Sequence, residues 1–240
     1  SRPITIMGLY LIRCTLLIYE EATLKIGIPT EITAGETRVS MTPEVISKLV
    51  TPSIEVLVQT NAGKHSFESD QNYLNAGARI IGDAPTLFNE SDVILKVLPP
   101  TENKDIGRHE IDLMRDGTTL ISFMQPLVNH ELVQRCLKQN ITSFSMDTIP
   151  RIARAQKCDA LTSMSSLSGY KAVLIAADTM GRLLPLMMTA AGTYAPAKGL
   201  ILGAGVAGLQ ALATGRRLGA MMFGYDVRPV VKEQVQSLGA

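Results

Sequence analysis

The sequence predicts an α/β protein with two parallel-sheet domains joined by a long helix, the second domain being truncated. Two observations support this fold class. From Leu24 onward, strand-like and helix-like segments alternate, which is typical of a parallel sheet with helices on its faces. A glycine-rich turn at residues 203–208 then lies between a strand-like run and a helix-like run, as in Rossmann-like dinucleotide-binding domains.

Residues 24–165 are expected to form the first domain. Its predicted strands are residues 24–28, 54–59, 92–97, 118–123 and 141–146, and its predicted helices are residues 43–50, 70–76 and 129–139. Thr42 is expected to cap the first helix, because threonine is a common cap and Pro43 suits the first helical position.

The segment that follows joins this domain to the second. A polar loop is predicted at residues 147–159, and the apolar residues 160–191 are predicted to form a long linking helix. Gly181 and Pro185 should kink or break that helix, since proline removes a backbone donor. Residues 166–240 would then comprise this helix and a partial nucleotide-binding domain.

Three glycines in the run GAGVAG (residues 203–208) each have an expected role. Gly203 should allow a tight turn, Gly205 should let a pyrophosphate approach the backbone, and Gly208 should let the helix pack closely on the strand. Free backbone N–H groups at the start of this helix, from Val206 and Ala207, would face the phosphates.

Asp226 follows the next predicted strand, residues 221–225, and is expected to bind the ribose hydroxyls of NAD with its neighbour Val227. A carboxylate would repel a 2′-phosphate, which favours NAD over NADP. Arg228 is a mild conflict, because arginine can accept such a phosphate. Because the sequence ends at Ala240, only two strands of this domain are expected, and either the domain is cut short or a second polypeptide completes it.

Composition argues against several classes of protein. The net charge of +1 and the lack of a basic stripe give no support for nucleic-acid binding. Three cysteines without a CxxC motif and three widely separated histidines give no support for a disulfide framework or a metal site. Residues 1–23 are expected to be an extension of unknown role, because the apolar stretch at residues 4–19 contains Arg13 and is short for a membrane span.

Three stretches together resemble one family. They are residues 147–173 (DTIPRIARAQKCDALTSMSSLSGYKAV), residues 196–240 with GAGVAGLQALA and YDVRPVVKEQVQSLGA, and the start, IGIPTE at 26–31 with ETRV at 36–39. The chain from about residue 24 resembles the NAD(H)-binding domain I of the alpha subunit of proton-translocating NAD(P) transhydrogenases.

This resemblance implies direct hydride transfer from NADH to NADP(H) bound on a separate domain, with no general acid or base. It implies that Arg151, Gln156 and Asp159 are the catalytic positioning residues and contact the nicotinamide, with Thr162 and Ser163 beside it. It also implies NADP-binding and membrane domains as partners, a homodimer at full length, and a peripheral location on the cytoplasmic or matrix face of the inner membrane.

Alanine dehydrogenase shares much of the pattern and is the main alternative. Arg38 and Lys96 match that family's substrate-binding arginine and lysine, but Gln125 stands where it has a histidine, and glutamine cannot take a proton near pH 7. That family's catalytic aspartate would lie beyond Ala240. A third possibility is a binding or assembly module that has no turnover by itself.

Overall fold

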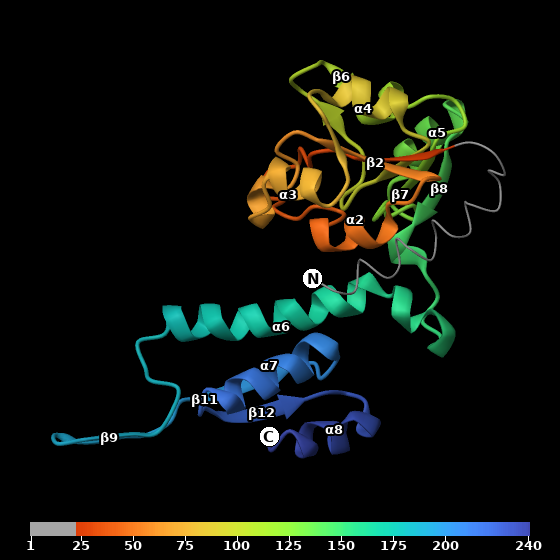
Figure 1. The fold of residues 1–240 in the computed structure, drawn as a ribbon. Helices are drawn as coiled ribbons and strands as arrows, with labels where there is room; N and C mark the ends of the chain where they lie inside the picture. The colour runs from red at the N-terminus through yellow and green to blue at the C-terminus, as the bar shows by residue number, and fades with distance from the viewer. Residues whose placement is uncertain (1–22) are drawn as a thin grey trace. The chain divides into compact units, whose positions relative to one another are not determined.

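A computed structural model describes residues 23–240. The chain divides into two compact units, one ending at Ala160 and one beginning at Leu161 (Figure 1). Each unit is described by itself below. The apolar stretch at residues 4–19 lies outside the described residues, so the expectation for the N-terminal extension stays an expectation.

The first unit is built on a six-stranded sheet in which every neighbouring pair of strands is parallel. Its strands are β1 Leu24–Ile28, β2 Ile54–Gln59, β3 Arg79–Ile81, β4 Val93–Leu95, β7 Thr119–Ser122 and β8 Thr142–Ser145. The spatial order is β3-β2-β1-β4-β7-β8. This is the doubly wound order, in which the direction of winding reverses between β1 and β4. The predicted α/β fold class is therefore confirmed.

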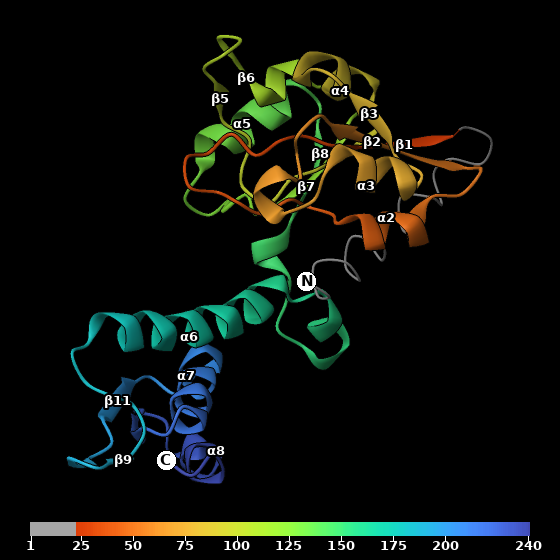
Figure 2. The same ribbon diagram turned by 60° about the vertical axis from the view of Figure 1, so that its left-hand side comes forward.

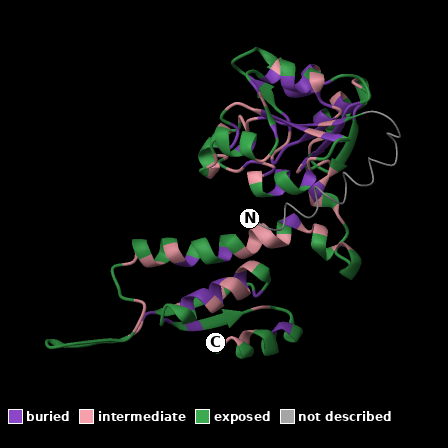
Figure 3. Ribbon diagram, viewed as in Figure 1, coloured by how far each residue is buried: buried purple, intermediate pink, exposed green. Residues whose placement is uncertain are grey.

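Helices cover both faces of this sheet (Figure 2). On one face, α2 (Pro43–Leu49) and α3 (Asp70–Asn75) pack on a cluster that includes Val56 and Val58. On the other, α4 (Ala84–Glu90) and α5 (His130–Lys138) pack on a cluster that includes Leu57. Successive strand residues point to opposite faces, so a strand with helices on both sides is apolar throughout, and its residues form the buried layer in Figure 3.

Side-chain caps begin two of these helices. The Ser69 hydroxyl accepts a hydrogen bond from the Asn72 N–H, and the Asp83 carboxylate accepts one from the Thr86 N–H at 2.9 Å. Thr42 does precede α2, and Pro43 does occupy its first turn, but the Thr42 side chain makes no capping bond. The expected N-cap position of Thr42 is confirmed, but without a side-chain bond, and Pro43, which has no N–H, already reduces the number of donors that need one.

The remaining elements of the first unit are short. Sequence analysis did not predict β3 (Arg79–Ile81) or α4 (Ala84–Glu90). The loop predicted at residues 147–159 contains two 3₁₀ helices. The short elements are η1 Lys64–Ser66, β5 Glu102–Asn103, β6 Arg108–His109, η2 Glu110–Leu113, η3 Met146–Thr148 and η4 Ala153–Cys158.

The predicted linking helix is shorter than expected. Helix α6 spans Ala160–Thr179, and the chain then forms an antiparallel hairpin of β9 (Met187–Thr189) and β10 (Gly192–Tyr194) instead of more helix. Gly181 and Pro185 follow the end of α6, in agreement with the predicted break in the helix. Gly192 has a φ of +136°, which suits glycine at the hairpin turn. Within residues 23–240, no helix is long and apolar enough to cross a membrane.

The second unit contains the predicted strand–helix–strand. Strands β11 (Lys198–Leu202) and β12 (Met221–Tyr225) are parallel, with Leu200 opposite Phe223, and α7 (Val206–Arg217) connects them. The unit ends with η5 (Pro229–Val231) and α8 (Lys232–Ser237).

Two close approaches hold this unit together. The Met222 sulfur lies where Cβ atoms on Gly199 of β11 and Gly215 of α7 would be, 2.8 and 2.5 Å away. On α6, a Cβ on Gly169 would overlap the Ala207 carbonyl oxygen in the first turn of α7. Glycine is therefore required where α6 crosses α7, because any side chain would push the two helices apart.

We expect Gly169→Ala to destabilise the second unit by about 1–3 kcal/mol, because the new methyl group collides with backbone. Hydrogen exchange should become faster in the α7 amides. Gly181→Ala is the matched control, since a Cβ there meets nothing within 4 Å, and it should change stability by less than about 0.5 kcal/mol. Equal exchange rates in the two variants would contradict this account of the α6–α7 crossing.

Candidate functional site

The glycine-rich turn has the local geometry that its sequence requires. Gly203 has a φ of +96°, in the region that favours glycine, and a Cβ on Gly208 would overlap the Gly203 carbonyl oxygen. The expected roles of Gly203 in the turn and of Gly208 in close packing are thus confirmed. A Cβ on Gly205 would meet nothing within 4 Å, so the space in front of this residue is open to a ligand.

Helix α7 begins at this open space. Gly205 is its N-cap residue and has no side chain that could cap it. The N–H groups of Val206 and Ala207 therefore have no helical acceptor, whereas the Leu209 N–H already bonds to the Gly205 carbonyl at 2.8 Å. The positive end of the helix dipole adds to the attraction for a negative group. This arrangement suits a phosphate or pyrophosphate.

Asp226 connects the end of β12 to the turn. Its Oδ2 accepts a hydrogen bond from the Ala204 N–H at 2.7 Å, and its Oδ1 accepts one from the Arg228 N–H at 2.8 Å. The Arg228 guanidinium donates to both oxygens at 3.0 Å. The side-chain bond from Arg228, followed by the two backbone bonds, holds the pKa of Asp226 well below its usual range, so the carboxylate is ionised at neutral pH.

Asp226 and Arg228 also line a hollow of about 430 Å³ between β12 and α8, together with Tyr225, Pro229 and Lys232. Each carboxylate oxygen of Asp226 already accepts two hydrogen bonds. A ribose diol has two O–H donors, and it would have to replace the guanidinium donors of Arg228 to bind here. Val227 is exposed beside them.

The other expected site residues lie at the end of the first unit and at the start of α6. Arg151 lies just before η4 and Gln156 lies within it, and both are exposed. Asp159 ends this helix, and its N–H donates a hydrogen bond to the Gln156 carbonyl at 3.2 Å. Thr162 and Ser163 follow in the first turn of α6. The expected residues therefore form two groups, one around η4 and one around the glycine-rich turn.

Sequence reasoning missed a buried charge cluster at the point where the winding of the first sheet reverses. Lys96 follows β4, and its Nζ lies 2.9 Å from Glu110 Oε1 and 3.3 Å from Glu31 Oε2. The side chains of Lys96 and Glu110 are each 1% exposed. Nothing in the sequence marked Glu110, whereas Glu31 lies in the conspicuous IGIPTE segment.

The carboxylates of this cluster also bind backbone N–H groups of neighbouring segments. Glu31 Oε1 accepts a hydrogen bond from the Val97 N–H at 2.6 Å, and Glu110 Oε2 accepts one from the Thr101 N–H at 2.9 Å. Burial raises the pKa of Glu110, and the Lys96 ammonium partly offsets that rise. Lys96 is thus paired within the protein, as expected for a residue with a structural role.

Arg38 and Gln125 lie after strands of the same sheet. The Arg38 guanidinium donates to both carboxylate oxygens of Glu36, and its Nε lies 2.7 Å from Oε1. Gln125 is exposed and has a φ of +51°, in the left-handed region that few residues other than glycine adopt. An amide here can donate and accept hydrogen bonds, but it cannot exchange a proton near neutral pH.

Histidine and cysteine contribute no metal site within residues 23–240, where no three His, Cys, Asp or Glu side chains gather suitably. His109 is half-buried and its Nδ1 accepts a hydrogen bond from the Ile111 N–H at 3.2 Å, which assigns the proton of the neutral ring to Nε2. Burial lowers the pKa of this imidazole. Cys136 and Cys158 are free thiols.

Both units match profiles of one family. Residues 27–168 match the alanine dehydrogenase/PNT N-terminal domain, and residues 172–240 match the alanine dehydrogenase/PNT C-terminal domain. The chain belongs to the alanine dehydrogenase/PNT family.

Relatives in this family include both of the enzyme classes weighed above. The chain is 44% identical over 90% of its length to the NAD(P) transhydrogenase subunit alpha of Cereibacter sphaeroides, of which it covers 40%. It is 30% identical over 84% of its length to the alanine dehydrogenase of Mycolicibacterium smegmatis, of which it covers 53%. The chain thus spans about half the length of these relatives.

A solved structure of a transhydrogenase from Sinorhizobium meliloti is also similar. It aligns with a TM-score of 0.84 and 45% sequence identity, over 90% of this chain and 63% of that one. The fold of this family member is therefore that of transhydrogenase structures.

We expect Lys96→Met to destabilise the first unit by about 3–5 kcal/mol, because two buried carboxylates lose their cation. The Lys96 ammonium partly offsets the rise in the pKa of Glu110, so removing it raises that pKa further and lets the buried carboxyl become protonated more readily as pH falls. The loss should therefore be larger at pH 7 than at pH 5. Hydrogen exchange of the β1 and β4 amides at the two pH values measures this loss of stability.

Lys48→Met is the matched control for this experiment. Lys48 pairs with Glu44 at 2.8 Å on the exposed surface of α2. Such a pair contributes only about 0.3–0.5 kcal/mol. If the two substitutions reduced the stability of the first unit equally, the charge cluster around Lys96 would not have the stabilising role described above.

Proposed function

We propose that this chain binds NAD(H) and is the NADH-binding component of an NAD(P) transhydrogenase, in which hydride passes directly from NADH to NADP held on a separate domain. The observation that carries the proposal is the Asp226 carboxylate bonded to the Ala204 N–H of a glycine-rich turn at the open start of α7. Membership of the alanine dehydrogenase/PNT family supports it.

The adenosine half of NAD fits the second unit by its chemistry. The pyrophosphate would accept hydrogen bonds from the N–H groups of Val206 and Ala207, with Gly205 leaving room for it and with Gly203 and Gly208 shaping the turn. The ribose hydroxyls would donate to Asp226, and the hollow beside this residue is large enough for an adenine ring. Val227 and Arg228 complete this cofactor-binding set.

The choice of NAD over NADP rests on charge. The carboxylate of Asp226 would repel a 2′-phosphate, and its low pKa keeps it ionised at neutral pH. The guanidinium of Arg228 is engaged by the same carboxylate and becomes available to a 2′-phosphate only where a ribose displaces it, so the preference for NAD rests on Asp226. NADP(H) therefore belongs on a partner domain.

The nicotinamide half requires positioning and no proton transfer. NADH supplies the hydride, and the protein has to hold the ring so that a second nicotinamide can approach to about 3–3.5 Å. We assign this task to Arg151, Gln156 and Asp159, with Thr162 and Ser163 next to them. Arg151 has a planar fork of donors, and Gln156 can both donate and accept, so the two suit a carboxamide.

Partners follow from this reaction. An NADP-binding domain must supply the acceptor, so the chain alone should show no turnover, and the membrane domain that moves protons would make this a peripheral component on the cytoplasmic or matrix face of the inner membrane. We assign residues 24–165 and 166–240 to two domains and expect a homodimer at full length.

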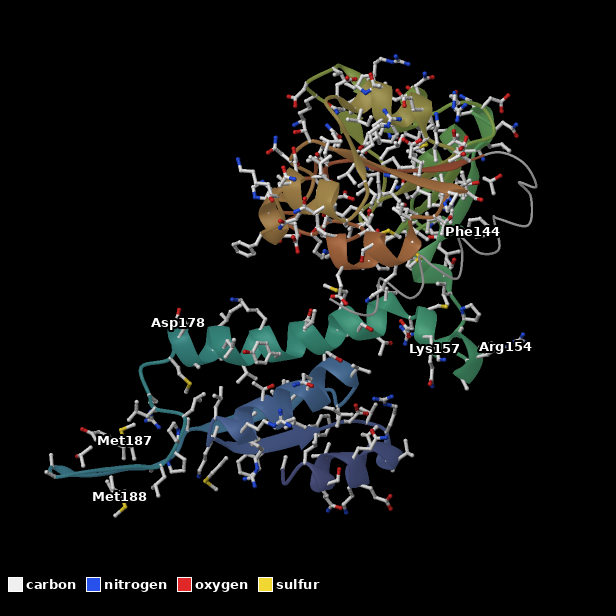
Figure 4. All side chains as sticks on the ribbon, in the orientation of Figure 1. Phe144, Arg154, Lys157, Asp178, Met187 and Met188 are labelled. Carbon is white, nitrogen blue, oxygen red and sulfur yellow. The ribbon has the colours of Figure 1, made fainter. Side chains whose placement is uncertain are left out.

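The second unit has apolar surface that supports such a homodimer. Leu167, Tyr170 and Ile175 are exposed on α6, and Ile175 is 54% exposed. Met187 and Met188 extend from the hairpin (Figure 4), and Met188 is 78% exposed. These exposed apolar side chains on α6 and on the hairpin are the surface that we expect a second copy of the chain to cover.

Alanine dehydrogenase is the alternative that a specific observation favours, because Arg38 and Lys96 both follow strands of the first sheet. However, carboxylates of the protein already neutralise both cations, and Gln125 cannot act as an acid or base. NADH production that depends on added alanine would favour this alternative over the transhydrogenase.

For cofactor choice, we expect the unmodified chain to bind NADH more tightly than NADPH in fluorescence titrations. Asp226→Ala should weaken NADH binding about tenfold to a hundredfold, because charge-assisted hydrogen bonds to the ribose are lost. Asp178→Ala, at an exposed aspartate near the end of α6 (Figure 4), is the control and should leave the affinity unchanged. Equal affinity of the unmodified chain for both nucleotides would falsify the assignment.

For the nicotinamide site, we expect Gln156→Ala to slow hydride transfer more than it weakens NADH binding. The reason is that a misplacement of about 1 Å can cost about 100-fold in rate. Stopped-flow transfer to a partner loaded with NADP, compared with NADH titration, separates the two effects. Gln134→Ala, at an exposed glutamine of α5, is the control. A Gln156→Ala chain with weak binding but a normal transfer rate would contradict the role.

A further inference from the structure

The side chains of the 3₁₀ helix η4 align in three rows along the helix axis, each of which is called a column below. With three residues per turn, side chains three residues apart lie above one another, about 6 Å apart along the axis. Ala155 and Cys158 form the inward column, because both are half-buried and Cys158 packs against the core of the first unit. The other two columns therefore face outward.

One outward column contains Gln156, with Asp159 three residues further on, and these are the residues assigned above to the nicotinamide. The other contains Arg154 and Lys157. Figure 4 shows the Arg154 and Lys157 side chains extending from this part of the chain. A cationic column thus runs beside the nicotinamide column, about 120° away around the helix.

The charges of Arg154 and Lys157 are not used in holding the described part of the chain together. Both side chains are exposed, and neither has a hydrogen bond or ion pair with any residue from 23 to 240. By contrast, Arg79 and Arg115 of the same unit each pair with a carboxylate. Residues 150–158 contain no acidic residue, and Asp159 at the end of η4 is the first carboxylate after them.

We propose that Arg154 and Lys157 form an electrostatic docking face for the NADP-bearing partner domain, which binds them through surface carboxylates. The inference rests on the proposed function. A nucleotide held by another protein can reach a nicotinamide beside Gln156 only if that protein covers the surrounding surface. The neighbouring column lies within that covered area, and complementary charge there would speed the encounter and fix its orientation.

Carboxylates suit this face better than the phosphates of the partner's nucleotide. Arg154 and Lys157 are separated by about one 3₁₀ turn, roughly 6 Å. Two carboxylates three or four residues apart on a helix have a similar spacing. A dinucleotide pyrophosphate is normally held by the N–H groups of its own domain, so its charge is already partly engaged there.

The test uses the full chain, NADH and the purified NADP-binding polypeptide of a transhydrogenase, with the double substitution Arg154→Glu and Lys157→Glu. NADH affinity should stay within about twofold, because neither side chain touches the nucleotide. Association with the partner at low salt should slow by about tenfold or more, since charge steering is lost. The dependence of association on salt should also fall, because fewer charge pairs are screened.

The control is the double substitution Lys104→Glu and Lys138→Glu, which makes the same charge change at two other exposed lysines of the first unit. It should leave partner association within about twofold, because steering depends on where the charge lies. Neutral substitutions, Arg154→Gln with Lys157→Gln, should give an intermediate loss.

The outcomes separate this inference from the function on which it rests. If the unmodified chain binds NADH and the partner, but the double substitution associates as fast as the control, the docking face is wrong and the proposed function stands. If the loss appears only when the partner holds NADP, phosphates and not carboxylates bind the face, which also overturns the proposal. If the unmodified chain binds neither NADH nor the partner, both proposals fail.

Discussion

The hydrogen bond from the Ala204 N–H to the Asp226 carboxylate is the contact on which the candidate nucleotide site depends. It joins the turn after β11 to the end of β12, so the residue that would read the ribose also fixes the loop that would hold the phosphates. The turn itself requires the left-handed φ of Gly203 and the absence of a side chain at Gly208. One carboxylate and two glycines therefore organise the start of α7.

Periodicity and motif spacing predicted the elements that share a clear apolar pattern. The strands that begin at Leu24, Ile54, Lys198 and Met221 have the predicted bounds, since each is a short and mostly apolar run, although only the first two are largely buried. The glycine-rich turn was predicted because each glycine satisfies a steric requirement that can be stated from the sequence. These features are local, so a single stretch of sequence is enough to find them.

The features that sequence did not predict depend on distant residues or on short runs. The first part of the hairpin, residues 187–191, was predicted as the end of the long helix because Met, Leu and Ala are good helix formers, and only the pairing with residues 192–194 distinguishes the two structures. The partners of Lys96 are 65 and 14 residues away in sequence, and no local pattern connects them. In the candidate site, the residues around η4 were suggested by family resemblance, because a polar loop alone does not indicate a ligand.

The packing of Met222 has a consequence for chemical durability. Its sulfur lies where side chains on Gly199 of β11 and Gly215 of α7 would otherwise be, so this thioether is part of the contact between the helix and the strand. Oxidation to the sulfoxide would make a buried apolar side chain polar. Damage at this single thioether would weaken the packing of α7 on β11, and the phosphate-binding turn would lose part of its support although none of its own residues had reacted.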